Sequence, residues 1–411
     1  MNDNFENMNL ECKSEVPYGL PRDVVFCKKC VMSNQRPSST VEFTNKNQKK
    51  EVINFDAEGI CSACRYHDMK WETIDWEKRQ SALEHLLDRH RSKDGTYDVV
   101  VPGSGGKDSV YVADVLKRKY GMHPLTVTWP PHLYTDIGLR NFQEWLKSGF
   151  GNITYNPNGL LHRYLTREAF LNLLHVFQPF IIGQKQVGPK TALKYGIKLV
   201  MYGESQGEAG SNLAETERPT MDPKYYSLPS GQVSNVRLGS RTVSELLESG
   251  FNKGDLDFYM PAVREEIISS GVEVHHMGFY ENWVSQDKFY YAVENCGFKP
   301  NPQRTEGTFS KSTSLDDKLD GFHFYTTLIK FGIGRATYEA SQEIRHKHIT
   351  REEAVALVHR YDDEFPSQYF QEFLDYISIN EEEFWNTIEK FRSPHLWRME
   401  NKTWELRYRV E

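Results

Sequence analysis

A run of small and charged residues at positions 104–109 has the composition of a phosphate-binding loop. The run stands directly between a predicted strand and a predicted helix and reads Ser104-Gly105-Gly106-Lys107-Asp108-Ser109. Glycines allow backbone conformations that aim several N–H groups at one point, and a helix N-terminus adds the positive end of its dipole. The two serines supply hydroxyl donors. The run therefore predicts a cradle for phosphate oxygens, and a Gly/Ser turn without a ligand is the alternative.

Two common phosphate motifs do not fit this run. A Walker A loop, G-x-x-x-x-G-K-[S/T], requires Ser or Thr after the lysine, but Lys107 is followed by Asp108. The dinucleotide fingerprint G-x-G-x-x-G fails as well. The run must belong to another class of phosphate loop.

Four of the six cysteines form two C-x-x-C pairs, Cys27 with Cys30 and Cys61 with Cys64. This is the paired spacing of a tetrahedral four-thiolate zinc site, because each pair can form one turn that points both sulfurs at one ion. Zinc held by four thiolates has no open position for water, so its role would be structural. The polar segment between the pairs is too poor in apolar residues for a core of its own, and Zn²⁺ would supply the missing stability. Ordinary buried or redox cysteines are the alternative.

The elements around the phosphate run alternate between strand and helix. Residues 97–101 are a short β-branched run, and residues 110–121 predict a helix that Gly121 closes. Residues 125–129 and 197–202 predict two further strands. This alternation predicts an α/β fold with a doubly wound, mostly parallel sheet.

We expect four regions along the chain. An amphipathic helix at 75–92, with Leu83, Leu86 and Leu87 on one face, would lead into the main domain. After residue 345 the pattern is helical again. The regions are a polar lead-in at 1–24, a four-cysteine zinc-binding module at 25–75, an α/β domain at 76–345 and a C-terminal helical region at 346–411.

Composition limits the class of protein. The 411 residues are 38% hydrophobic and 13% aromatic, which is ample for a core. The formal net charge of −7 argues against a protein whose main partner is nucleic acid. No run approaches the ~18 apolar residues of a membrane span, and the polar, acidic start is unlike a signal peptide, so we expect a cytoplasmic protein.

The phosphate run matches S-G-G-x-D-S and thereby resembles the pyrophosphate loop (PP-loop) of the N-type ATP pyrophosphatases. This superfamily, with an adenine nucleotide alpha hydrolase-like fold, includes asparagine synthetases, NAD synthetases and tRNA thiolases. The resemblance implies that ATP is split into AMP and pyrophosphate.

Longer stretches resemble the N-acetyl sugar amidotransferases (WbpG/PseA-like) of bacterial surface-polysaccharide synthesis. The resemblance covers nearly the whole chain from Cys27 onward. It implies that the acetamido group of a nucleotide-activated sugar becomes an acetamidino group during synthesis of the O-antigen of lipopolysaccharide. The stretches are CxxCVMS at 27–33, EGICSACR at 58–65, VVPGSGGKDS at 100–109, MYGES at 201–205, RTEGTFSKSTSLDDKLDG at 304–321, KFGIGRATYEASQEIR at 330–345 and TREEAVALVHRYD at 350–362.

The implied reaction needs no covalent enzyme nucleophile. Transfer of AMP from ATP to the amide oxygen gives an O-adenylyl imidate, and ammonia can then displace AMP. The protein would hold ATP and sugar in line, with Mg²⁺ and basic groups stabilising the departing pyrophosphate. In this hypothesis the loop's serines and glycines bind pyrophosphate, Lys107 adds charge and Asp108 positions Mg²⁺ or the loop.

Further site residues are expected outside the loop. Lys330 and Arg335, in KFGIGR, are candidates to neutralise pyrophosphate from the other side, with surface charge as the alternative. Gly203 and Glu204 follow a predicted strand, where ligands collect in open α/β sheets, although Glu204 or Ser205 could instead cap a helix.

Two pairs of neighbouring residues are weaker candidates. Asp316 and Asp317 could bind Mg²⁺ or a sugar hydroxyl, but adjacent acidic residues are usually only solvated. His275 and His276 have no metal-ligand spacing around them, so a functional role is less expected still.

Ammonia must come from outside the chain. Asn2 excludes a glutaminase with an N-terminal cysteine nucleophile, and neither Cys12 nor Cys296 lies in the Gly-flanked elbow of a triad glutaminase. We expect either free ammonia or a separate glutaminase acting with a cyclase-like subunit, because the family resemblance implies partners like the two imidazole-glycerol-phosphate-synthase subunits.

Two rival functions stay open at this stage. A tRNA thiolase would combine the same loop with zinc cysteines, but the acidic charge and the lack of a cysteine pair after the loop argue against it. A non-catalytic nucleotide-binding scaffold is the second rival, and Asp108 with the 330–335 stretch argues against that.

Overall fold

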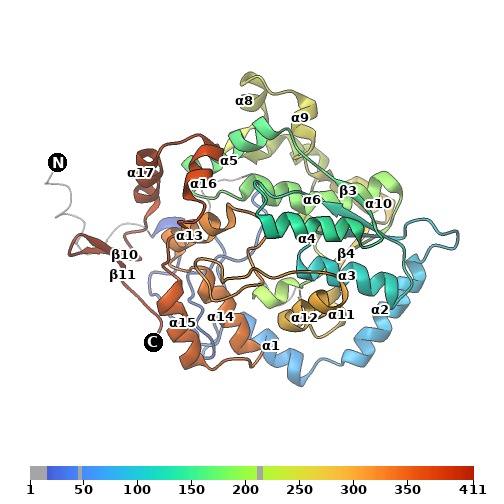
Figure 1. Ribbon diagram of the computed structural model, residues 1–411, viewed down its shortest axis with the longest axis horizontal. Helices are drawn as coiled ribbons and strands as arrows, with labels where there is room; N and C mark the ends of the chain where they lie inside the picture. Colours follow the sequence, from blue (N-terminus) through green and yellow to red (C-terminus); the bar gives the residue numbers. More distant parts are fainter. Residues whose placement is uncertain (1–15, 45–48, 211–215) are drawn as a thin grey trace.

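The computed structural model describes residues 16–44, 49–210 and 216–411, with a central parallel sheet between two layers of helices (Figure 1). The sheet has the strand order β3-β2-β1-β4-β9, and every neighbouring pair is parallel. The predicted α/β class and parallel sheet are confirmed. Its strands are β1 (Val99–Pro102), β2 (Pro124–Thr128), β3 (Gly151–Thr154), β4 (Leu199–Tyr202) and β9 (Glu273–His276).

The sequence of strand β1 is apolar throughout because both of its faces are buried. Val100 packs into a large core with α5 (Gly159–Leu173) and α6 (Gln178–Tyr195), whereas Val99 and Val101 pack into a second core with α2 (Trp76–His90) and α3 (Lys107–Arg118). Because both faces of a parallel sheet are covered, the strand reads as a continuous apolar run rather than an alternating one. The sheet is therefore doubly wound, as the alternation of elements predicted.

The first half of the chain supplies helices to both layers. The predicted linking helix is observed as α2, where the Asp75 side chain caps the N-terminus by accepting from the Lys78 N–H, and its three leucines are buried. The helices are α1 (Ser62–Glu72), α2 (Trp76–His90), α3 (Lys107–Arg118), α4 (Asp136–Lys147), α5 (Gly159–Leu173) and α6 (Gln178–Tyr195).

The shorter elements follow β4, except for η2 near the start of the described chain. The helical pattern at 243–270 is interrupted twice, and Pro261 lies in the second interruption. The 3-10 helices are η2 (Pro17–Gly19), η3 (Gln206–Ala209), η4 (Pro223–Tyr225) and η5 (Ser230–Asn235). The short strands are β5 (Ser227–Leu228), β6 (Arg237–Leu238), β7 (Arg241–Thr242) and β8 (Ala262–Val263). The α-helices are α8 (Val243–Glu248), α9 (Lys253–Asp257), α10 (Arg264–Ser270), α11 (Met277–Tyr280) and α12 (Ser285–Asn295).

The C-terminal region contains helices, as expected, but it ends in a hairpin that the sequence analysis did not anticipate. Asn401 and Lys402 have positive φ at the turn, as in a two-residue hairpin loop. Arg392 lies between the rings of Trp397 and Trp404 and fixes the hairpin to the helices. The elements are α13 (Asp320–Phe331), α14 (Arg335–Arg345), α15 (Arg351–Tyr361), α16 (Phe370–Ile377), α17 (Glu381–Phe391), β10 (Trp397–Glu400) and β11 (Thr403–Leu406).

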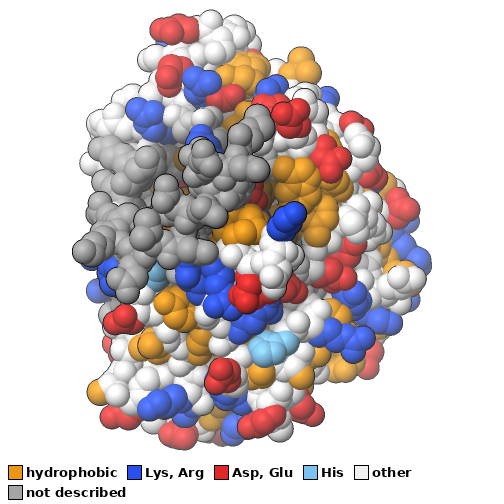
Figure 2. All heavy atoms as spheres, turned by 90° about the vertical axis from the view of Figure 1, so that its left-hand side faces the viewer, with side chains coloured by type: hydrophobic (Ala, Val, Ile, Leu, Met, Phe, Trp, Pro, Cys, Tyr) orange, Lys and Arg blue, Asp and Glu red, His pale blue; other side chains and the backbone are white. Residues whose placement is uncertain are grey.

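The surface carries a mixture of charges. On the face shown in Figure 2, Lys and Arg side chains lie among acidic and apolar ones. Within the described ranges, no helix is both long and apolar enough to cross a bilayer.

The C-terminal helices share the main core with the sheet layer. The ring of Phe373 on α16 is fully buried, and its centroid lies 4.2 Å from that of Phe322 on α13 and 5.4 Å from that of Phe170 on α5. These contacts join three helices, so α16 is part of the main fold rather than a loosely attached tail.

We expect Phe373→Ala to destabilise the protein by about 3–5 kcal/mol, because it leaves a cavity where three helices meet. Leu160→Ala is the matched control, since Leu160 is 74% exposed and should change stability by less than ~0.5 kcal/mol. Equilibrium urea unfolding measures both. Equal stability of the two variants would contradict this packing.

Candidate functional site

The phosphate loop lies where the sheet reverses its strand order. From β1 the chain builds β2 and β3 on one side and then returns to β4 and β9 on the other. Ligands of open α/β sheets bind beyond the carboxyl ends of strands at such a point. The loop joins the end of β1 to Lys107, the first residue of α3, and the N-cap residue Gly106 provides no side-chain cap. The first N–H groups of α3 are thus available to an anion.

Two glycines are required by close contacts at this point. Gly105 has φ +87°, and a Cβ there would lie 2.8 Å from the carbonyl oxygen of Asn141. At the end of β4, a Cβ on Gly203 would lie 3.0 Å from the Trp283 ring and 3.4 Å from Cβ of Asp108. The structure therefore places Gly203 against the loop.

Charged side chains of both signs surround the loop. Lys107 Nζ donates to Asp108 Oδ2 at 2.7 Å, and these side chains are 9% and 39% exposed. Asp108 Oδ1 is buried and accepts no hydrogen bond within the described residues. Burial, together with the nearby carboxylates of Glu208 and Asp108, raises the pKa of Glu204 to about 7. Asp108 and Glu204 thus offer oxygens of the kind that Mg²⁺ prefers.

Two cavities are lined by residues of the loop. The first has a volume of about 280 Å³ and lies between the carboxyl ends of β1, β2 and β4. Besides the loop it is lined by Trp129, Gln184, Lys185, Tyr202 and Glu204. The second has a volume of about 200 Å³ and is lined by the loop, Asn141, Phe298, residues 312–316 and Arg335. Residues of the same loop therefore line both cavities.

Arg335 is brought to the loop by the N-terminus of α14. Its guanidinium lies over the Phe324 ring and forms an ion pair with Glu339. Burial opposes the charge on Arg335, but Glu339 and Asp320 keep its pKa above the usual value. Arg335 and Lys107 therefore place two cationic side chains on the second cavity.

Lys330 is not brought to the loop. It lies near the end of α13, and Gly332, with φ +67°, ends that helix before α14 begins. Lys330 Nζ donates to the carbonyl of Leu173 at 3.0 Å, and burial followed by the charge of Lys50 lowers its pKa to about 7. Lys330 lines neither cavity at the loop. The side chains of Lys330 and Arg335 diverge because they belong to different helices.

Asp316 and Asp317 have separate partners, and neither is simply solvated. Asp316 Oδ2 accepts from Ser104 Oγ at 2.7 Å, which connects it directly to the phosphate loop. Burial raises the pKa of Asp316. Asp317 Oδ2 accepts from the backbone N–H of His132 at 2.8 Å and pairs with its Nδ1 at 2.7 Å. Asp316 is therefore a site residue, whereas Asp317 holds the loop after β2.

Several cavity residues have no signature in the sequence. Trp129 directly follows β2 and Tyr202 is the last residue of β4, while Gln184 and Lys185 lie within the long helix α6. Only the order of the strands brings them together. His275, by contrast, binds Tyr280 and Glu273 at the edge of the sheet and lines neither cavity.

The four cysteines form one buried cluster. The Sγ atoms of Cys27 and Cys64 lie 3.9 Å apart, those of Cys30 and Cys61 lie 3.7 Å apart, and all four lie within 4.8 Å of one another. Sulfurs bound at about 2.3 Å to a tetrahedral zinc ion are themselves about 3.8 Å apart. The cluster therefore fits Zn²⁺ with little adjustment.

The surroundings of the cluster suit a negatively charged thiolate site. The backbone N–H groups of Lys29 and Cys61 point at Cys27 Sγ, at 3.4 and 3.3 Å. Arg345 on α14 is buried beside the cluster, and although burial opposes its charge, the thiolates keep its pKa raised. The module thus packs against the helix that carries Arg335 at its other end.

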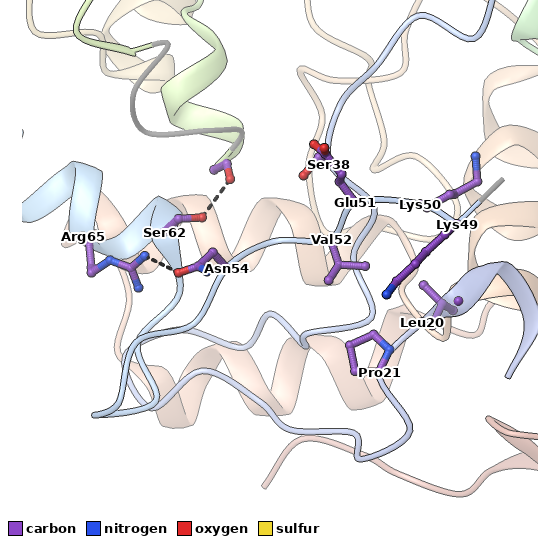
Figure 3. Close-up of a pocket in the computed structure, with 12 residues that line it drawn as sticks. Leu20, Pro21, Ser38, Lys49, Lys50, Glu51, Val52, Asn54, Ser62 and Arg65 are labelled. Atoms are coloured by element: carbon purple, nitrogen blue, oxygen red, sulfur yellow. Dashed lines mark hydrogen bonds between the residues drawn. The ribbon is translucent and has the colours of Figure 1, made fainter. Parts of the chain in front are cut away.

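The largest of the cavities described is lined mostly by residues close to the four cysteines in sequence, and no residue of the loop lines it (Figure 3). It has a volume of about 750 Å³ and is lined in part by Lys49, Lys50 and Arg65. Ser62 Oγ donates to the Gly210 carbonyl and Arg65 to Asn54 on its wall. None of the predicted site residues lines it, so we place the chemistry at the loop.

Cys64→Ser should remove one metal ion per chain and lower the unfolding temperature, because a closed zinc site contributes roughly 10–16 kcal/mol of binding free energy to folding. Cys296→Ser is the control, since Cys296 lies outside the cluster. Elemental analysis and thermal unfolding test both variants. Unchanged metal content in Cys64→Ser would refute the four-cysteine site.

Gly105→Ala should destabilise the protein by about 1–3 kcal/mol and weaken phosphate binding, because alanine at φ +87° is strained and its methyl group meets Asn141. Gly159→Ala is the matched control, because its Cβ would meet nothing within 4 Å. Urea unfolding compares them. A Gly105→Ala protein as stable as the control would show that the loop has another conformation.

Comparison with known proteins identifies the C-terminal quarter of the chain. In one match, 81 residues, 20% of this chain, are 32% identical to an uncharacterized protein of Methanocaldococcus jannaschii, and the chain spans 28% of the length of that relative. Residues 306–410 match the family model described as LPS biosynthesis protein WbpG-like, C-terminal domain. The match supports the resemblance to the WbpG-like lipopolysaccharide biosynthesis proteins over residues 306–410, a region similar to their C-terminal domain.

Proposed function

We propose that this protein is an ATP-dependent amidotransferase that converts the acetamido group of a nucleotide-activated N-acetyl sugar into an acetamidino group, forming AMP and pyrophosphate. The product would enter the synthesis of lipopolysaccharide O-antigen or a related surface polysaccharide.

The observation that carries the proposal is the composition of the second cavity at the loop. Loop residues 104–108 line it, together with residues 312–316 and Arg335, which all belong to the region that matches the WbpG-like domain. Ser104 and Asp316 are hydrogen-bonded across it. The phosphate loop and the WbpG-like domain thus build a single site, which favours a reaction of phosphate chemistry within that family.

In this proposal ATP binds at the carboxyl ends of β1 and β4. The loop N–H groups and the start of α3 hold the β- and γ-phosphates, while Lys107 and Arg335 neutralise pyrophosphate as it departs. Asp108 and Glu204 would hold Mg²⁺, which supplies charge stabilisation on the phosphate oxygens. The free Oδ1 of Asp108 supports this assignment, because a buried carboxylate oxygen without a donor is a suitable metal ligand.

Two displacement steps account for the reaction. The acetamido oxygen attacks the α-phosphorus of ATP, the bond to the β,γ-pyrophosphate breaks, and the amide nitrogen loses its proton as the imidate forms. Ammonia then adds to the imidate carbon, and the C–O bond breaks to release AMP. Oxygen leaves on AMP and nitrogen takes its place. Positioning and charge stabilisation suffice for both steps.

Ammonia is proposed to come from a separate glutaminase with a cyclase-like subunit, or from solution. The WbpG-like domain favours the amidotransferase over a tRNA thiolase with the same kind of loop.

The direct test is an assay with ATP, Mg²⁺, ammonium ion and a panel of nucleotide-linked N-acetyl sugars, in which pyrophosphate release is measured and products are analysed by mass spectrometry. We expect sugar-dependent pyrophosphate and a product lighter than its sugar by the difference between O and NH. Turnover only with tRNA and a sulfur donor would replace this proposal with the thiolase.

Asp108→Asn should reduce sugar-dependent pyrophosphate release by roughly 100-fold or more while leaving the fold intact. The reason is that the change removes the negative charge of a proposed Mg²⁺ ligand beside the phosphates. Asp88→Asn is the control: Asp88 is an exposed residue of α2 that pairs with Arg91, and it should keep full activity. Full activity in Asp108→Asn would exclude the assigned role.

A further inference from the structure

A second cluster of potential metal ligands lies between the zinc module and the sheet. His67 belongs to α1, Glu208 to η3 just after β4, and His346 is the C-cap residue of α14. These residues are 2%, 1% and 5% exposed. Three elements that are far apart in sequence therefore meet at one buried point.

The possible ligand atoms of the three residues lie close together. One ligand atom from each residue lies within 4.8 Å of the other two. His67 Nε2 is 2.5 Å from Glu208 Oε2, and the rings of His67 and His346 have centroids 5.0 Å apart. Lys70 holds the other carboxylate oxygen, Oε1, at 2.5 Å and also binds the carbonyl of Trp283. Lys70 thus orients the carboxylate with Oε2 toward the imidazoles.

The cluster also leaves polar atoms unsatisfied. Within the described part of the chain, both ring nitrogens of His346 and Nδ1 of His67 are buried without a hydrogen-bond partner. Burying a polar group without a partner is unfavourable, and native proteins seldom leave one so. A metal ion would use a lone pair of His346 that now has no role.

We propose that His67, Glu208 and His346 form a second metal site, separate from the four cysteines, for a divalent first-row transition ion such as Zn²⁺. Two imidazoles and one carboxylate are a common ligand set for such ions, with water as a further ligand. A bound ion would connect α1, through His67, to the 3-10 helix η3, through Glu208. It does not depend on the proposed reaction.

The test measures metal content and metal environment in the full-length protein. Elemental analysis should find two ions per chain, and zinc X-ray absorption should show nitrogen and oxygen neighbours besides sulfur. If the purified protein holds one ion, titration with Co²⁺ should load a second, whose spectrum lacks the sulfur charge-transfer bands of a tetrathiolate. A single all-sulfur ion together with no uptake of Co²⁺ would overturn the proposal.

Variants locate the second ion. His346→Ala should lose it and keep the four-sulfur ion. The control is His348→Ala, because His348 lies two residues further on, pairs with Glu343 and is outside the cluster. Equal loading of the second ion in both variants would overturn the proposal. The absorption spectrum of the unmutated protein keeps the test valid if His346→Ala fails to fold.

Discussion

Strand β1 pairs in parallel with β2 on one side and with β4 on the other, and this pairing determines where the loop and the neighbouring strands lie. The chain adds β2 and β3 on one side of β1 and then β4 and β9 on the other side. The carboxyl ends of β1 and β4 therefore border a space that no crossover helix covers. The loop after β1 and Gly203 after β4 face each other there. Gly105 and Gly203 permit approaches that a side chain would block.

The C-terminal region completes this site rather than standing apart from it. Asp316 reaches Ser104, and Arg335 begins a helix whose other end, Arg345, is buried beside the cysteine cluster. Helix α14 thus spans from the phosphate loop to the zinc module. Tyr338 and Ile344 of α14 pack against the hydrophobic cluster that contains the four cysteines.

The features that the sequence predicted well are local ones. The cysteine pairs and the strand–loop–helix around Ser104 depend on neighbours along the chain, so spacing and composition reveal them. Arg335 and Lys330 are five residues apart, but the helix end at Gly332 sends them to different places, which the sequence alone did not show. Contacts such as Ser104 with Asp316 or His67 with Glu208 join distant segments and have no periodic signature. The terminal hairpin was missed because helical patterns precede it.

The central claim is that the amide oxygen of the sugar is transferred to AMP at this site. The most direct measurement uses a nucleotide-linked N-acetyl sugar whose acetyl carbonyl carries a heavy oxygen isotope, with ATP, Mg²⁺ and ammonium ion, and follows the label by mass spectrometry. The account predicts that the heavy oxygen appears in AMP. Its appearance in inorganic phosphate, or its retention in the sugar while ATP is cleaved, would contradict the account.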